Sequence, residues 1–145
     1  MTFSSDLARF TAKTIRNSNN IVRKIVIDMG ESLVIRTPVG DPSIWQSAPP
    51  PGYAGGRARA NWQYGSGEMP AGVIDAIDKY GDSTISKIID GVKSSKVASV
   101  HWIASSLPYT KRLEEGWSTQ APQGMLRLTV MQFEDIVKSA VQALK

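Results

Sequence analysis

The stretch "SSDLARFTAKTIRNSNNIVRKIVIDMGESLVIR", from Ser4 to Arg36, decides the fold that this sequence predicts. Its apolar residues recur every three or four positions, which is the spacing of one face of an α-helix. Ser4 or Ser5 can cap the start of the helix, and Pro38 ends it, because a proline forces the residue before it out of helical geometry. An unbroken helix of this kind would be about 50 Å long, at 1.5 Å per residue.

Five basic residues of this helix fall roughly opposite its apolar stripe on a helical wheel: Arg9, Lys13, Arg16, Arg23 and Lys24. One interpretation is the solvated face of a helix that packs on the core. The other is a basic surface that faces DNA or an acidic partner, since most of the net charge of +4 falls in the first 40 residues. The weak helix formers at residues 17–20 and Gly30 are where the helix could break or bend.

Composition narrows the classes of protein to which the chain can belong. Its 145 residues, 41% hydrophobic and 21% charged, suit a single globular domain over residues 1–145. Without cysteine, and with His101 as the only histidine, it cannot form disulfides, thiolate metal sites or sites that need two imidazoles. No apolar run approaches the ~20 residues of a membrane span, and the N-terminus lacks the apolar core of a signal peptide. We expect no membrane contact and synthesis in a cytoplasm.

The remaining segments predict a small α+β domain, in which the long N-terminal helix and a C-terminal helix pack on a small antiparallel sheet. An extended Pro/Gly-rich loop at about residues 38–56 is too long for a mere connection, and loops of this size are usually functional or disordered. After it the patterns predict, in order, a strand from Arg57 to Tyr64, a short helix through Val73–Ile77, a helix capped by Asp82, a strand from Val97 to Ser105, a helical turn opened by Pro108 and a final helix from about Gly124 to Leu144.

No motif marks the chain as an enzyme. The glycines between Gly52 and Gly67 form neither GxGxxG nor GxxxxGK[ST], so a phosphate-binding loop is not expected. His101 has no nucleophile motif around it. The adjacent pair Glu114-Glu115 points to different faces of a helix and cannot converge as a catalytic pair. We therefore expect a protein without catalytic residues, without a cofactor and without a metal.

The segment "GRARANW", Gly56 to Trp62, is the strongest candidate for nucleic-acid binding. On a strand, Arg57 and Arg59 would share one face, and Trp62 could stack on a base. The alternative is a structural strand whose arginines pair with nearby glutamates. No known nucleic-acid-binding signature surrounds the segment, so both interpretations stay open.

Two stretches together resemble a known family. The first is the basic helix that ends in "TPVGD", Thr37 to Asp41, followed after a glycine-rich loop by "GRARANW". The second is "LPYTKRLEEGWSTQAPQGMLRLTV", Leu107 to Val130. In this order they are similar to the tail-completion or neck (head–tail joining) proteins of long-tailed phages, whose last helix follows a Tyr-Ala-x-x-Leu/Val-Glu-x-Gly-x-Ser-x-Gln-Ala-Pro segment. The matching positions are Tyr109, Leu113, Glu114, Gly116, Ser118, Gln120, Ala121, Pro122 and Gly124.

The chain departs from the family pattern at two places. In the family the first helix ends in Pro-Val-Asp-Thr-Gly-x-Leu-Arg-x-Ser, whereas here Pro38-Val39 is followed by Gly40-Asp41 and an extended loop before Gly56. Thr110 replaces the usual alanine of the second motif.

The resemblance implies a non-enzymatic structural protein of the virion neck or tail, present in the host cytoplasm during assembly. It further implies a six- or twelve-fold homo-oligomeric ring, joined to other head-connector and tail proteins, and it leaves contact between the basic helix face and packaged DNA open. A tail terminator ring that caps the tail tube is one alternative, and a small basic nucleic-acid-binding domain is an alternative of a different class. The subunit interface is expected at aromatic, arginine and glutamate side chains: Trp45, Tyr53, Arg57, Arg59, Trp62, Tyr109, Glu114 and Trp117.

Overall fold

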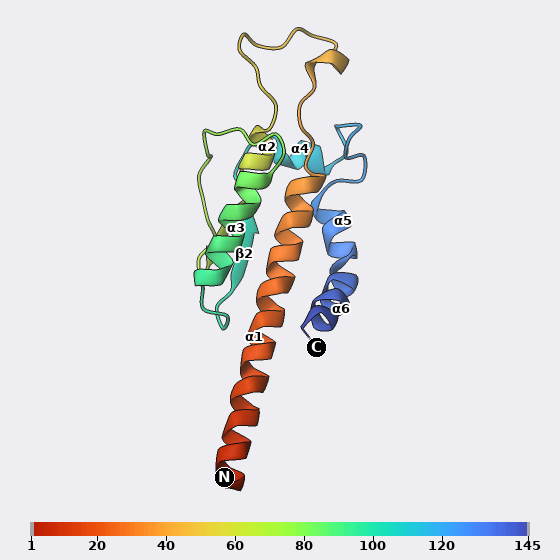
Figure 1. Cartoon of the computed structure of the whole chain (residues 1–145). Coiled ribbons are helices and arrows are strands. Elements are labelled where there is room, and N and C mark those ends of the chain that lie inside the picture. The colour runs from red at the N-terminus through yellow and green to blue at the C-terminus, as the bar shows by residue number, and fades with distance from the viewer. Residues whose placement is uncertain (1, 145) are drawn as a thin grey trace.

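The computed structural model describes residues 2–144, and one long helix forms its axis (Figure 1). This helix, α1 (Phe3–Arg36), has 34 residues and runs unbroken through residues 17–20 and Gly30. Gly30 does not break the helix but lies where the next layer packs closely against it. A Cβ atom at Gly30 would lie 3.0 Å from Cγ2 of Ile88, so the glycine lets a neighbouring helix approach rather than bending its own.

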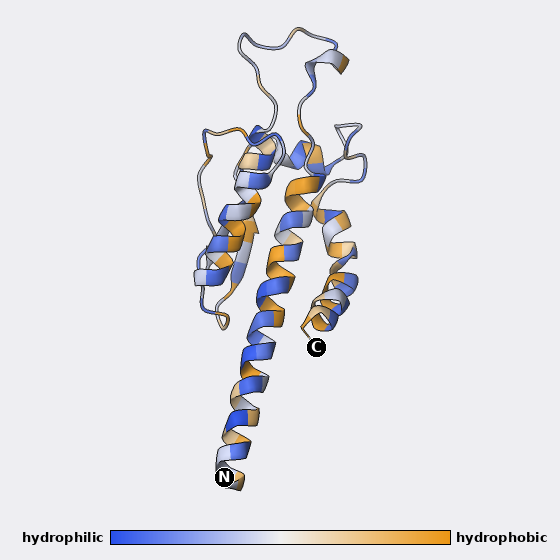
Figure 2. Cartoon of the chain, viewed as in Figure 1, coloured by the Kyte–Doolittle hydropathy of each residue, from blue (hydrophilic) through white to orange (hydrophobic). Residues whose placement is uncertain are grey.

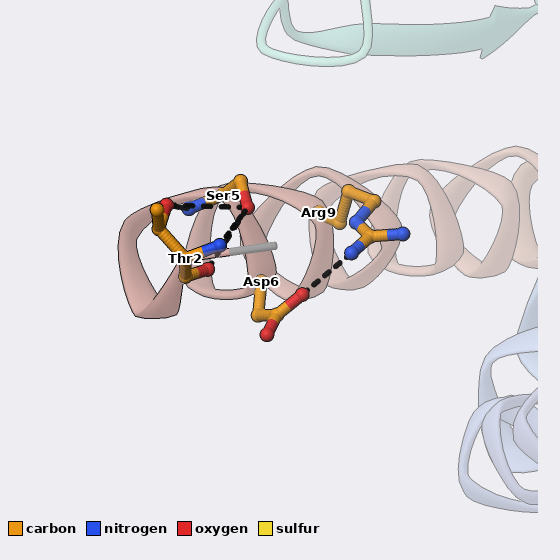
Figure 3. Close-up of polar contacts among 4 residues, drawn as sticks. All are labelled: Thr2, Ser5, Asp6 and Arg9. Atoms are coloured by element: carbon orange, nitrogen blue, oxygen red, sulfur yellow. Dashed lines mark hydrogen bonds and ion pairs between the residues drawn. The ribbon is translucent and has the colours of Figure 1, made fainter.

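The N-terminus of α1 is closed by a capping box (Figure 3). The N-cap is Thr2, whose hydroxyl accepts a hydrogen bond from the Ser5 backbone N–H at 3.3 Å. In return, the Ser5 hydroxyl accepts one from the Thr2 N–H at 3.2 Å. The prediction of a cap at Ser4 or Ser5 was wrong, because Ser5 acts as the third residue of the helix.

Two groups of elements pack along α1, one on each side (Figure 1). One side carries α3 (Asp82–Ser94) and a two-stranded antiparallel sheet, made of β1 (Gln63–Ser66) and β2 (His101–Ala104). In this sheet Gln63 lies opposite Ala104. The other side carries α5 (Leu126–Met131) and α6 (Phe133–Ala143). The predicted α+β class, with a long N-terminal helix, is therefore confirmed.

The C-terminal segment forms two helices where the sequence predicted one. They meet at Gln132, which ends α5 and precedes α6. The second strand is also shorter than predicted, since it spans His101–Ala104 only. A short helix, α4 (Thr110–Glu114), follows Pro108 as expected but starts two positions after it.

The segment predicted as a strand from Arg57 to Tyr64 begins as a helical turn, α2 (Arg57–Ala60). Gly56 precedes it in the left-handed region, with a φ of 113°. The sequence "RARA" lacks β-branched residues and is rich in good helix formers, which favours a helical turn over a strand. Because the turn is helical, Arg57 and Arg59 do not share a strand face.

No helix forms at residues 73–77, although one was predicted there. Asn61 accounts for the difference. Its side-chain oxygen accepts a hydrogen bond from the Ile74 N–H at 2.8 Å, and its amide nitrogen donates to the Ile74 carbonyl at 3.1 Å. Both backbone groups that Ile74 would use in a helix are therefore bonded to a buried side chain.

The N-terminus of helix α3 is capped by Asp78, which lies before the helix and not at its N-cap position. Gly81 precedes it in a left-handed conformation, and Asp82, the predicted cap, is its first residue. The Asp78 carboxylate accepts hydrogen bonds from the backbone N–H of Gly81 at 3.0 Å and of Thr84 at 2.7 Å. Burial raises the pKa of Asp78, but the bonds from Thr84 and Gly81 outweigh it, so the pKa lies below its ordinary value.

The hydrophobic core lies around the C-terminal half of α1. Its buried members are Leu33, Val34, Trp62, Ile88, Val92, Ala121 and Met125. The residues of α1 up to position 18 are exposed, and this half of the helix projects beyond the other elements (Figure 1). The core therefore joins the two quoted motifs, through Trp62 and Met125, to one end of α1.

Candidate docking site

The C-terminal end of α1 is closed by Arg59. Its Nε donates to the Thr37 carbonyl at 2.8 Å, its Nη2 to the Ile35 carbonyl at 2.9 Å, and its Nη1 to the Lys79 carbonyl at 2.7 Å. Carbonyls at the end of a helix have no partner within it, and they carry the negative end of the helix dipole. Arg59 was predicted as an interface residue, and nucleic-acid contact was one of two interpretations of its segment, but its guanidinium is bonded to the chain's own backbone.

Trp62, another predicted interface residue, belongs to the core. Only 7% of it is exposed, and its indole N–H donates to the Thr37 hydroxyl at 2.7 Å. The same hydroxyl donates to the Leu33 carbonyl at 2.6 Å, one turn back along α1. A buried tryptophan needs a partner for its N–H, and Thr37 provides one while it completes the helix end. Trp62 is therefore unavailable to a partner subunit or a base.

Glu114, the third predicted interface residue with an internal role, organises the start of α5. Its carboxylate accepts hydrogen bonds from the backbone N–H groups of Met125 and Leu126 at 2.8 Å, and of Arg127 at 2.9 Å. Burial raises the pKa of Glu114, but the three N–H donors together outweigh it and hold the pKa below its ordinary value. Gly124 allows the close approach, since a Cβ there would lie 2.6 Å from the Glu114 carbonyl oxygen.

The two motifs that carry the family resemblance meet at Val39 and Gln120. The Gln120 side-chain amide donates to the Val39 carbonyl at 2.8 Å and accepts from the Val39 N–H at 3.2 Å. These two bonds join the start of the 38–56 loop to the segment after α4. Residues far apart in the sequence are thereby brought to one end of α1.

The 38–56 loop has structure of its own. A short 3-10 helix, η1 (Pro42–Ile44), is capped by Asp41, whose carboxylate accepts from the Ser43 N–H at 3.0 Å. The hydrogen bond from the Ser43 hydroxyl, with that from its N–H, lowers the pKa of Asp41. The rings of Trp45 and Tyr53 form an edge-to-face pair, with centroids 4.8 Å apart.

The two arms of this loop touch at a pair of glycines. A Cβ at Gly55 would lie 2.6 Å from the Gly40 carbonyl oxygen, and a Cβ at Gly40 would overlap the Tyr53 hydroxyl. The aromatic pair can therefore fold back over the base of the loop only because position 40 has no side chain.

A pocket of about 680 Å³ opens between this loop, α2, α4 and residues 117–120. Five of the eight predicted interface residues line it: Trp45, Tyr53, Arg57, Tyr109 and Trp117. Trp117 is the most exposed of its four aromatic members, at 70%. Burial raises the pKa of Tyr109, the nearby Tyr53 adds to the rise, and the positive charge of Arg57 opposes it. The structure thus gathers separately predicted residues into one aromatic surface, which we call the aromatic pocket.

Arg112 is a member of the aromatic pocket that the sequence did not single out. Its guanidinium carbon lies 4.8 Å from the centroid of the Trp117 ring, within the range of a cation–π contact. The Trp117 N–H also donates to the Arg112 carbonyl at 3.2 Å, because the chain turns back at Gly116, where φ is 87°. Gly116, directly before Trp117, is the signal in the sequence from which this contact between Arg112 and Trp117 could have been predicted.

The basic face predicted on α1 is divided by the fold. Arg9, Lys13 and Arg16 lie on the exposed, projecting half of the helix. Arg23 is half-buried and donates to the Ser95 carbonyl at 3.3 Å, and Lys24 pairs with Asp28 at 3.1 Å. Arg23 therefore contacts the segment that follows α3, whereas Arg9, Lys13 and Arg16 stay on the exposed surface of the projecting half.

Replacement of Gln120 by alanine is expected to loosen the base of the 38–56 loop. The change removes both hydrogen bonds to Val39 while the core stays intact, because the side chain is exposed. Each such bond contributes about 1 kcal/mol, so cleavage within the loop should accelerate several-fold in limited proteolysis. Gln123→Ala serves as the control, because Gln123 is exposed and forms no hydrogen bond to Val39. Equal cleavage rates for both variants would show that the two hydrogen bonds between Gln120 and Val39 do not hold the base of the loop.

Residues 2–144 contain neither a cluster of metal-binding side chains nor a membrane-spanning helix. No group of three or more histidine, cysteine, aspartate or glutamate side chains there is placed to hold a metal ion. No helix in the same range is long and apolar enough to cross a membrane. No known protein family, curated protein or solved structure matches the chain.

Proposed function

We propose that this chain is a non-enzymatic structural protein of a virion, and that it acts at the head–tail junction of a long-tailed phage as a neck or tail-completion protein. The observation that carries the proposal is the ordered pair of motifs, Thr37 to Asp41 with "GRARANW", then Leu107 to Val130. Together they reach from the end of the first helix, at Thr37, to Val130 near the start of the last one. A tail terminator ring remains the close alternative, because the same motifs do not distinguish the two positions in the virion.

The internal contacts of both motifs support the proposal. Arg59 and Trp62 of the first motif close the end of α1, and Glu114 of the second closes the start of α5. Gln120 then binds the two segments together at Val39. The motif residues thus serve one shared architecture, which is what a family signature without catalytic residues is expected to do.

The aromatic pocket is the surface that suits contact with a neighbouring subunit. Trp, Tyr and Arg are the residue types that dominate binding energy at protein interfaces, and this pocket combines two tryptophans, two tyrosines and two arginines. One wall is the extended loop that distinguishes this chain from the shorter family pattern. We assign the aromatic pocket to subunit docking within the proposed ring.

The contacts of the "GRARANW" segment do not favour the nucleic-acid-binding alternative. Its motif was "GRARANW", in which Arg59 donates to three backbone carbonyls and Trp62 is buried. Arg57 remains exposed at the rim of the aromatic pocket.

The direct test is to purify the phage that encodes this chain, identify its virion proteins by mass spectrometry and locate the chain by electron microscopy. The proposal expects the chain in a ring between head and tail. A ring that caps the tail tube itself, without contact to the head connector, would favour the terminator alternative. Absence of the chain from purified virions would refute the proposal.

Assembly should fail when the aromatic pocket is emptied of its exposed rings. The variant with Tyr53→Ala and Trp117→Ala removes two anchors that lie outside the core, so the chain should still fold. Interface anchors of this kind each contribute about 2 kcal/mol, or about thirtyfold in an equilibrium constant, so incorporation into virions should collapse in a complementation assay. Trp102→Ala, a half-exposed tryptophan of β2 outside the pocket, is the matched control. Normal incorporation of the double variant would exclude the pocket as the docking surface.

A further inference from the structure

The projecting half of α1 carries an apolar stripe that no other element of residues 2–144 covers. Phe3, Leu7 and Phe10 are 81%, 51% and 68% exposed, and Thr14 continues the same spacing of four, three and four residues. Figure 2 shows apolar residues recurring along this half of the helix, past the end of α6. Two exposed phenylalanines in phase on a free helix are unusual for a surface that remains in water.

The same face of α1 is covered further along the helix. Ser32 lies 29 residues after Phe3, and eight turns of 3.6 residues bring the two onto one face. Ser32 shares a hydrogen bond of 2.9 Å with Thr129 of α5, and with Ile35 it lines a groove against Ile136 of α6. The stripe is therefore a packing face that α5 and α6 cover at one end and leave bare at the other.

From this stripe we infer that two copies of the chain pair through their projecting helices, side by side and antiparallel. The 4-3-4 spacing is that of the a and d positions of a coiled coil. If Phe3 and Phe10 occupy d, and Leu7 and Thr14 occupy a, an antiparallel pair places Leu7 against Phe10 of the second copy, and Phe3 against Thr14. The four layers repeat symmetrically about the centre of the segment, as a two-fold interface requires.

The charges beside the stripe select the antiparallel arrangement. Asp6 and Lys13 fall at the g positions of this heptad, whereas Ser4, Thr11 and Ser18 fall at e. In an antiparallel pair the g position of one helix faces the g position of the other, so Asp6 meets Lys13 twice. A parallel pair would set g against e and form no ion pair. Asp6 pairs with Arg9 in the single chain (Figure 3), but both are exposed, so exchange of partner costs little.

The expected interface is small, and the pairing goes beyond the proposed function. Four phenylalanines and two leucines would bury on the order of 1,000 Å², the lower limit for a specific interface, which describes a weak and reversible pair. The aromatic pocket lies at the other end of α1, so the pairing neither requires nor excludes a ring. Its failure would leave the proposed ring unaffected, and loss of the ring would leave the pairing intact.

The first test is sedimentation velocity of the whole chain over about a hundredfold range of concentration, where a reversible dimer dissociates on dilution. The variant with Leu7→Lys and Phe10→Lys should remain a monomer throughout, with an unchanged melting temperature, since neither residue contacts the core. Ile15→Lys is the matched control: Ile15 is 55% exposed on the same helix half but off the stripe, and this variant should still pair. A wild-type chain that stays monomeric, or equal losses in both variants, would overturn the inference.

The second test is a charge swap. Asp6→Lys alone should weaken pairing about tenfold, because two attractive pairs become repulsive ones. Adding Lys13→Asp to the same chain restores opposite charges across the pair and should restore most of the affinity. Equal affinity of the single and double variants would overturn the antiparallel arrangement.

The third test uses the absence of cysteine from the sequence, which makes any introduced cysteine unique. A Phe3→Cys chain mixed with a Thr14→Cys chain should form a mixed disulfide between two copies, since these positions share a layer. Each chain alone should cross-link poorly. Cross-linking of each variant to itself would instead indicate a parallel pair and overturn the antiparallel assignment.

Discussion

Replacement of Arg59 by alanine should lower the free energy of unfolding by about 3 kcal/mol. The change removes three charge-assisted hydrogen bonds, which the guanidinium donates to the carbonyls of Ile35, Thr37 and Lys79. Thr37 is buried, so its carbonyl would lose its partner without gaining water, which is the costlier part of the change. The positive charge at the negative end of the α1 dipole is lost as well.

Denaturant unfolding followed by circular dichroism measures this effect, and the same segment offers a control. Arg57→Ala removes the same side chain two positions earlier, from an exposed site at the pocket rim, and should change stability by less than about 0.5 kcal/mol. Arg59→Lys should recover only part of the loss, because an ammonium cannot reproduce the guanidinium fork across three carbonyls. Similar effects of Arg57→Ala and Arg59→Ala would contradict the helix-capping role.

Replacement of Glu114 by glutamine should also cost about 3 kcal/mol. Three backbone N–H groups, of Met125, Leu126 and Arg127, point at the Glu114 carboxylate. Glutamine offers one oxygen and one NH₂ group, so a donor would face a donor and the negative charge would be gone. Glu115→Gln is the neighbouring control, since Glu115 is exposed and should contribute little.

The pH dependence of the Glu114 effect follows from its lowered pKa. A carboxyl with a lower pKa in the folded state contributes stability that is fully present above its unfolded value, about 4.3, and is lost as the pH falls through the folded value. The stability difference between the wild type and Glu114→Gln should therefore be largest above about pH 5 and shrink under acidic conditions. Asp78 also has a lowered pKa and titrates in both proteins, so only the difference between them reports on Glu114. A difference that stays constant down to pH 3 would show that the charge of Glu114 is not what α5 requires.

Strong local periodicity accounts for the elements that sequence reasoning found. The apolar spacing of α1 and of α3 extends over several turns, so the helices could be predicted without any knowledge of their neighbours. The predictions for short segments were wrong because these segments are too short to show any periodicity. Four residues such as "RARA" are too few to show the period of a helix or of a strand, so the loose alternation of the segment was misleading and its helix-forming composition was the better signal.

The candidate site was predicted in its residue types but not in their roles. Exposed rings such as Trp45, Tyr53 and Trp117 were assigned to an interface one by one, and the fold places them around one pocket. Arg59, Trp62 and Glu114 were assigned to the same interface, yet they bond to backbone groups of distant segments. A residue type that suits an interface suits a buried hydrogen-bond network equally well, and composition cannot distinguish the two.

The sequence by itself determined the α+β class, the long first helix and the absence of cysteine chemistry, because each depends on local pattern or on composition alone. The tertiary structure decided which polar side chains are occupied, where the pocket lies and which half of α1 stays uncovered. These depend on segments that meet only after folding, as Val39 meets Gln120 and Thr37 meets Trp62. Hydrogen bonds between such segments leave no periodic trace in the chain, so only the folded structure can reveal them.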